Sequence, residues 1–175
     1  YHPFLRRLRN LEMPFLTAVN GPAAGVGMSF ALMGDLVLCA KSAYFLQAFR
    51  RIGLVPDGGS TWLLPRLVGN ARAKELSLLA EKLPADKALD WGLVNRVAPA
   101  DKLEAAVDDL AAPILAKSAA AVAAGKRAFY RQLEMGMDAA YAYTAEEMAR
   151  NMMCADAAEG IDAFMQKRDP EWTHR

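Results

Sequence analysis

The sequence predicts an α/β core followed by a helical C-terminal region. Short apolar runs bounded by Gly, Pro or Asn occur at residues 15–19, 36–40 and 44–46, and stretches with helical periodicity separate them from later runs. Strands that alternate with helices at this spacing are typical of α/β units with parallel pairing. Beyond residue 99 no strand signal remains. We therefore expect an α/β part over residues 1–98 and a helical part over residues 99–175.

Local signals predict the elements of the α/β part. An amphipathic helix over 5–11 is stopped by Pro14, and a helix of small apolar residues covers 28–33. Asn70 is expected to cap a helix that follows Leu67. Gly92 is expected to end a short helix that opens at Pro84, before a last strand near 94–97.

In the helical part, one residue is expected to end a helix and three are expected to cap the helices that follow. Pro113 is expected to kink or end a helix that begins near Leu103. Ser118, Asp138 and Asp156 are expected to cap the three helices that follow.

Composition excludes several classes of protein. Lys and Arg total 21 and Asp and Glu total 20, so the net charge of +1 supplies no strong field for nucleic acid or an anionic membrane. No apolar stretch is long enough to cross a bilayer, and two cysteines make no disulfide framework, which favours a reducing, cytoplasmic compartment. The high apolar content of 54% suggests subunit contacts.

Histidine chemistry is predicted to be absent. The only histidines, His2 and His174, lie at the two ends of the sequence, so a catalytic triad or a zinc site has no supply of imidazole. The glycines at 21, 25 and 27 are not spaced as a dinucleotide fingerprint, and the sequence contains no P-loop. We therefore expect no metal and no separate cofactor.

Residues 20–27, Asn-Gly-Pro-Ala-Ala-Gly-Val-Gly, end a predicted strand in a turn of small residues that leads into a helix. The first N–H groups of such a helix have no intrahelical acceptor, and they would stabilise an oxyanion. The alternative interpretation is that the glycines only allow a helix and a strand to pack closely.

Asp57 is the second candidate, because it is the only carboxylate between Asp35 and Glu75 and its sequence neighbours are largely apolar. A carboxylate in an apolar pocket is a stronger base, whereas a helix N-terminus keeps it ionised. Both influences suit proton abstraction next to a carbonyl. An Asp before Gly-Gly is also a common turn residue or N-cap, and the two interpretations are compatible.

Taken together, these motifs resemble the crotonase superfamily of enoyl-CoA hydratases and isomerases. The likeness covers residues 18–35, continues through the Asp57 loop to 92–94, and returns at 159–168. It implies a crotonase-like spiral of ββα units with a C-terminal helical oligomerisation region, and it implies that the N-terminal part of the family fold is absent. It also implies a homotrimer or dimer of trimers, with coenzyme A entering only as part of an acyl-CoA substrate.

The resemblance assigns roles to individual residues. The Val26 N–H would be one of two donors to the thioester oxygen, with Ala24, Gly25 and Ser29 beside it in the substrate-binding segment. Lys167 would lie near the CoA phosphates, although a lysine at a helix end is also an ordinary solvated residue.

Departures from the family pattern refine the expected activity. Ser29 and Phe49 stand where hydratases of the family carry two glutamates, so ordinary hydration is disfavoured. Asp57 matches the single catalytic aspartate of some isomerases, most closely the type that acts on ring-epoxide CoA thioesters in phenylacetate catabolism. A related dehalogenase places an aspartate nucleophile there, which fits less well because no histidine is expected nearby.

The sequence therefore predicts an acyl-CoA isomerase in which Asp57 moves a proton and Val26 helps to stabilise the enolate. Phe49 and Trp62 are candidates for an apolar acyl pocket, with core packing as the alternative for each. An enoyl-CoA hydratase, another lyase or hydrolase of the family, and a non-catalytic binding protein are the rival hypotheses.

Overall fold

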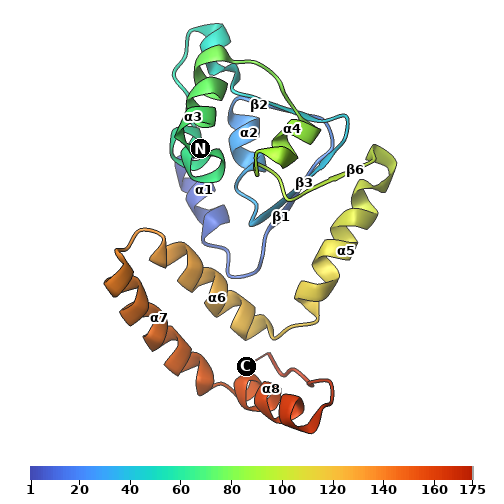
Figure 1. The fold of residues 1–175 in the computed structure, drawn as a ribbon, viewed down its shortest axis with the longest axis vertical. Helices are drawn as coiled ribbons and strands as arrows, with labels where there is room; N and C mark the ends of the chain where they lie inside the picture. The colour runs from blue at the N-terminus through green and yellow to red at the C-terminus, as the bar shows by residue number, and fades with distance from the viewer. Residues whose placement is uncertain (175) are drawn as a thin grey trace. The chain divides into compact units, whose positions relative to one another are not determined.

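The computed structural model describes residues 1–174, and their contacts form two compact units. The first unit contains Tyr1–Leu11 and Phe15–Asp109, and the second contains residues 12–14 and those from Leu110 onward. Figure 1 shows the ribbon of both units. The boundary between them falls inside helix α5 (Leu103–Leu115).

A three-stranded parallel sheet forms the centre of the first unit. Its strands are β1 (Leu16–Val19), β3 (Leu36–Ala40) and β6 (Arg96–Ala98), in the order β1-β3-β6. The central strand β3 pairs with β1 at Leu38↔Ala18 and with β6 at Cys39↔Val97. The expected parallel pairing of these strands is confirmed, and β3 is buried at four of its five residues, as a strand with neighbours on both sides should be.

A second, smaller sheet differs from the expectation. It has the order β2-β4-β5, with β2 (Pro22–Ala24) parallel to β4 (Tyr44–Leu46) and β5 (Leu83–Pro84) antiparallel to β4. The sequence indicated a turn over residues 22–24, which was wrong because the chain finds a pairing partner there. The turn proper lies at Gly25, whose φ of 55° favours glycine.

Helices of the first unit surround these sheets. They are α1 (His2–Arg9), α2 (Val26–Ala31), η1 (Ala48–Ile52), α3 (Ser60–Leu79), α4 (Ala85–Asp90) and η2 (Ala100–Lys102). The core contains Met28 of α2, Leu38 of β3, Phe45 of β4 and Leu64 of α3, all completely buried. This core fixes where α2 and α3 begin, and both candidate motifs lie at those beginnings.

Two helix-end predictions in this unit had different outcomes. Gly92 follows the last residues of α4 with a φ of 75°, as expected for a residue that ends a helix. Asn70 is not an N-cap. Gly69, with a φ of 79°, interrupts the helical backbone of α3, so Asn70 is the first residue after that break.

The second unit consists of helices. After the end of α5 come α6 (Ala119–Gln132), α7 (Met137–Met152) and α8 (Ala155–Gln166). Ser118 caps α6 as expected, since its side chain accepts a hydrogen bond from the Ala121 N–H. Asp138 and Asp156 instead lie in the first turns of α7 and α8. Pro113 lies within α5, close to the end of that helix.

Burial in the second unit is sparse. Of its described residues, only Ser118, Ala140, Asp156 and Ala163 are buried. Large apolar side chains such as Met153 and Phe164 are 87% and 81% exposed. Over the residues that the structure describes, no helix is long and apolar enough to cross a membrane.

Candidate active site

The turn before α2 provides a backbone hydrogen-bond donor. The Gly25 N–H donates to the Leu46 carbonyl at 2.9 Å, which extends the pairing of β2 with β4 up to the turn. Val26 is the first residue of α2, so its N–H has no acceptor within the helix. The Phe49 ring lies beside this turn, because a Cβ at Gly25 would meet it at 3.9 Å.

The Asp57 loop packs directly on the first turn of α2. The hydroxyls of Ser29 and Ser60 both donate to the Asp57 carbonyl oxygen, at 3.2 and 3.0 Å. Gly58 has a φ of 66°, and a Cβ there would lie 2.9 Å from Ser29 and 3.1 Å from the Val26 side chain. The turn at residues 20–27 and Asp57, which are 30 to 37 residues apart in the sequence, are therefore adjacent in space.

Ser29 thus fixes the position of the Asp57 loop on α2. Its side chain is completely buried, and its hydroxyl is used by the main chain of Asp57. The resemblance placed Ser29 among the substrate-binding residues, whereas these contacts support a positioning role. Ser60, which sequence reasoning missed, has the same function from the first turn of α3.

The Asp57 carboxylate is charged and accessible. Its Oδ1 lies 2.8 Å from Nε2 of His2, and the two side chains are 53% and 66% exposed. The hydrogen bond from His2 is the main cause that lowers the pKa of Asp57, and a hydrogen bond from the Gly58 N–H adds to it. Both stabilise the ionised form, so Asp57 is a carboxylate anion at neutral pH.

The expected apolar surroundings of Asp57 are not present in the described part of the chain. Ile52, Leu54 and Val55 are 72%, 58% and 80% exposed, so they do not enclose the carboxylate. Desolvation is a smaller influence on its pKa than hydrogen bonding. Asp57 is also not the N-cap of α3, because that position belongs to Gly59.

The prediction that no histidine is available was wrong. His2 reaches Asp57 although 55 residues separate them in the sequence. A position near one end of the sequence does not determine which element a helix packs against. The only local signal for this contact was the amphipathic pattern of the first helix, which does not specify a neighbour.

Trp62 has a different environment from the one expected. Its ring is flanked by two guanidinium groups, that of Arg9 at 4.3 Å and that of Arg66 at 3.9 Å from the ring centroid. Such stacking is a cation–π arrangement that joins α1 to α3. Trp62 therefore links two helices next to the site, and an acyl-pocket role for it stays a prediction. Ala24 is exposed at the end of β2.

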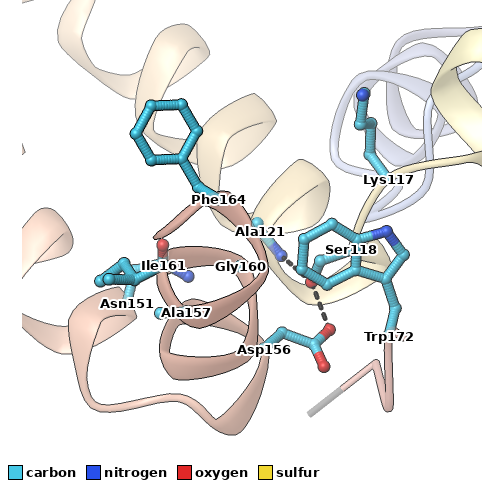
Figure 2. A pocket seen from close by; sticks show the side chains of 10 residues that line it. All are labelled: Lys117, Ser118, Ala121, Asn151, Asp156, Ala157, Gly160, Ile161, Phe164 and Trp172. Carbon is cyan, nitrogen blue, oxygen red and sulfur yellow. Dashed lines mark hydrogen bonds between the residues drawn. The ribbon is translucent and has the colours of Figure 1, made fainter. Parts of the chain in front are cut away.

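Lys167 belongs to the second unit, where it ends α8 in a left-handed conformation with a φ of 56° and an exposed side chain. A pocket of about 470 Å³ lies between α6, α8 and the C-terminal segment, and Lys167 is not among its lining residues. Figure 2 shows this pocket, with Trp172 on one side and Phe164 on the other.

Asp156 is one of the residues that line this pocket. It accepts hydrogen bonds from the Ser118 hydroxyl at 2.5 Å, from the Thr173 N–H and hydroxyl at 2.7 and 2.8 Å, and from the His174 N–H at 3.0 Å (Figure 2 shows the first). The Ser118 contact is the main cause that lowers its pKa to about 2. These hydrogen bonds tie both the start of α6 and the C-terminal segment to α8, which supports a structural role for Asp156.

The geometry thus defines an α/β protein in which a backbone donor and one ionised carboxylate meet at the start of two helices. The sequence pattern of the enoyl-CoA hydratase/isomerase family matches residues 1–175, and the chain belongs to this family. The expected crotonase-type fold is confirmed, because the chain superimposes on solved enoyl-CoA hydratases. One from Polaromonas sp. JS666 gives a TM-score of 0.92 at 33% identity, covering 98% of this chain and 66% of that one.

Curated relatives carry different activities in their names. A probable enoyl-CoA hydratase of Rhodobacter capsulatus is 43% identical over all of this chain and 68% of its own length. The 1,2-epoxyphenylacetyl-CoA isomerase of Escherichia coli is 38% identical over 99% of this chain and 66% of its own length. This chain therefore spans about two thirds of the length of these relatives.

Proposed function

We propose that the protein is an acyl-CoA isomerase that stabilises a thioester enolate and uses Asp57 as its single proton carrier. The observation that supports this proposal is the packing of the Asp57 loop on the first turn of α2, held by Ser29 and closed by Gly58. This contact keeps a carboxylate and an unpaired backbone donor within one small region.

The proposed reaction has two proton transfers. The Val26 N–H donates to the thioester oxygen and stabilises the negative charge that develops there when a neighbouring carbon loses its proton. Asp57, ionised at neutral pH, accepts that proton and returns it to a different carbon. The double bond moves, no atom is gained or lost, and one carboxylate is sufficient.

The residues beside the turn favour isomerisation over hydration. Water addition needs groups that activate a water molecule and protonate the substrate, and Ser29 is buried and engaged with Asp57 while Phe49 has no ionisable group. Hydration is kept as a second candidate because a relative at 43% identity is named a probable enoyl-CoA hydratase.

Substrate and assembly are part of the proposal. Similarity to the Escherichia coli isomerase supports ring-epoxide or enoyl-CoA esters as substrates, with a place in phenylacetate or fatty acid metabolism in the cytoplasm. The exposed apolar side chains of the second unit support a homotrimer or a dimer of trimers, since contacts between copies would cover them.

Product analysis tests the proposal. The whole protein is incubated with a 3-enoyl-CoA, a 2-enoyl-CoA and a ring-epoxide CoA thioester, and the products are separated by chromatography and weighed by mass spectrometry. We expect products of unchanged mass in which a double bond or ring has rearranged. Products that are heavier by one water, with no isomer formed, would contradict the proposal and support hydration.

A further inference from the structure

His2 makes a contact that the proposed reaction does not by itself require. Its Nε2 lies 2.8 Å from Oδ1 of Asp57. An ionised carboxylate has no proton to donate, so the imidazole is the donor in this hydrogen bond. The contact joins the first residue of α1 to the loop before α3.

Helix α1 is anchored so that His2 stays over the loop. The rings of Tyr1 and Phe4 pack edge-on against Phe30 of α2, with centroid distances of 5.7 and 5.6 Å. At the other end of the helix, Arg9 stacks on Trp62 of α3. One helix is thus held on both elements that carry the candidate site, which makes the position of His2 a consequence of packing.

Few other charges act on Asp57. Helix α2 contains no ionisable residue, and the first turn of α3 contains no acidic one. His2 is therefore the main side chain that influences this carboxylate.

We propose that His2 is a positioning residue for Asp57: the hydrogen bond from His2 fixes one carboxylate oxygen while the other oxygen exchanges the substrate proton. This inference rests on the proposed proton-carrying role of Asp57. Its chemistry is a charge-assisted hydrogen bond, which is stronger than a neutral one and orients its acceptor.

The consequence is a shift in the pH dependence of the reaction. The hydrogen bond from His2 lowers the pKa of Asp57, so its loss raises that pKa towards the ordinary value. Asp57 acts as a base only when ionised. The acidic limb of the pH profile of kcat/KM therefore moves to higher pH without His2.

The test uses His2→Ala, which removes the donor, and His2→Gln, which replaces the imidazole by an amide donor. Arg7→Gln, on the same helix and also exposed, is the matched control. The pKa of Asp57 in the whole protein is followed by ¹³C NMR of the carboxyl carbon, assigned by its absence in Asp57→Asn. The pH profile of kcat/KM is measured with a 3-enoyl-CoA as the probe.

We expect His2→Ala to raise the pKa of Asp57 and to lower kcat/KM on the acidic side by roughly two- to fivefold, as for an exposed charged pair. His2→Gln should restore part of both effects, and Arg7→Gln should change neither. An unchanged pKa of Asp57 in His2→Ala would overturn the inference.

The NMR measurement also separates this inference from the proposed function. If His2→Ala raises the pKa of Asp57 but the wild-type protein forms no isomer, the hydrogen bond is real but serves no isomerase reaction. The inference as stated then fails together with the proposed function. An unchanged pKa in an active isomerase removes the role of His2 alone. Circular dichroism of each variant confirms that it is folded, which is expected because His2 is 66% exposed.

Discussion

The two units of this chain are stabilised in different ways. The first buries large apolar side chains between two sheets and their helices, and Phe45, Met28, Leu38 and Leu64 are fully enclosed. The described part of the second buries two alanines, Ala140 and Ala163, together with Ser118 and Asp156. A hydrophobic core therefore stabilises the first unit, whereas the buried residues of the second unit include a hydrogen-bonded polar pair, Ser118 and Asp156.

This difference indicates that, within the described part of the chain, only the first unit has a packed core that can hold side chains and loops in fixed positions. A packed core tolerates little displacement, so it can hold the turn at Val26 and the Asp57 loop in fixed positions. The helices of the second unit present Phe164 and Met153 to the outside. Surfaces of that kind are typical of contacts with other chains.

The largest expected effect comes from a pair of truncations, one in each unit. Leu38→Ala removes a completely buried side chain and should cost about 2–5 kcal/mol of the free energy of unfolding. Phe164→Ala removes a larger side chain that is 81% exposed, so within one copy it should cost far less. Chemical denaturation of both variants measures the difference.

The same pair of variants also tests the proposed assembly. Light scattering at several concentrations should show a weaker oligomer for Phe164→Ala and an unchanged oligomer for Leu38→Ala. A monomeric wild-type protein would contradict the assembly, and a Phe164→Ala cost equal to that of Leu38→Ala in a monomer would contradict the contrast between the units.

Gly58→Ala is expected to damage the site with a moderate effect on stability. The new Cβ would lie 2.9 Å from Ser29 in a backbone conformation with a φ of 66°, which costs about 1–3 kcal/mol for a non-glycine residue. The loop should then move away from Val26 and reduce kcat more than it raises KM. Gly53→Ala, also at positive φ but with open space around it, is the control. Equal kinetics for the two variants would refute the proposed packing of the Gly58 loop.

Asp156→Asn should weaken the second unit by a smaller amount, about 5 °C in Tm at neutral pH. The pKa of Asp156 is lowered to about 2 from its ordinary value of 3.8, so its charged form is favoured by folding. That stabilisation is complete above about pH 4 and is lost as the pH falls to about 2. The Tm difference from wild type should therefore shrink over this interval.

Asp162→Asn, an exposed carboxylate on the same helix, is the control for Asp156→Asn. Thermal melts at a series of pH values measure both variants. A constant difference between wild type and Asp156→Asn from neutral pH down to pH 2 would contradict the assigned role of Asp156.

Local sequence patterns correctly predicted strands and helix ends that depend on nearby residues. The apolar runs gave the parallel strands, Ser118 gave a helix cap and Gly92 gave a helix end, because each depends on residues within a few positions. The turn motif and the Asp57 loop were identified as candidates by their residue types alone.

Long-range contacts were not predictable in this way. The hydrogen bond of His2 to Asp57 depends on how α1 packs on two other helices, and the stacking of Trp62 between two arginines depends on the same packing. Strand β2 forms because β4 offers it a partner, although its sequence, Pro-Ala-Ala, has low strand propensity.

The most direct test of the account is the isomerase activity of Asp57→Asn in the whole protein. Asparagine keeps the shape of the side chain but accepts no proton, so kcat should fall by roughly 10²–10⁴-fold while binding of the CoA ester stays within a few-fold of wild type. Asp90→Asn, exposed at the end of α4, should behave as wild type. Full isomerase activity in Asp57→Asn would contradict the central claim that this carboxylate carries the proton.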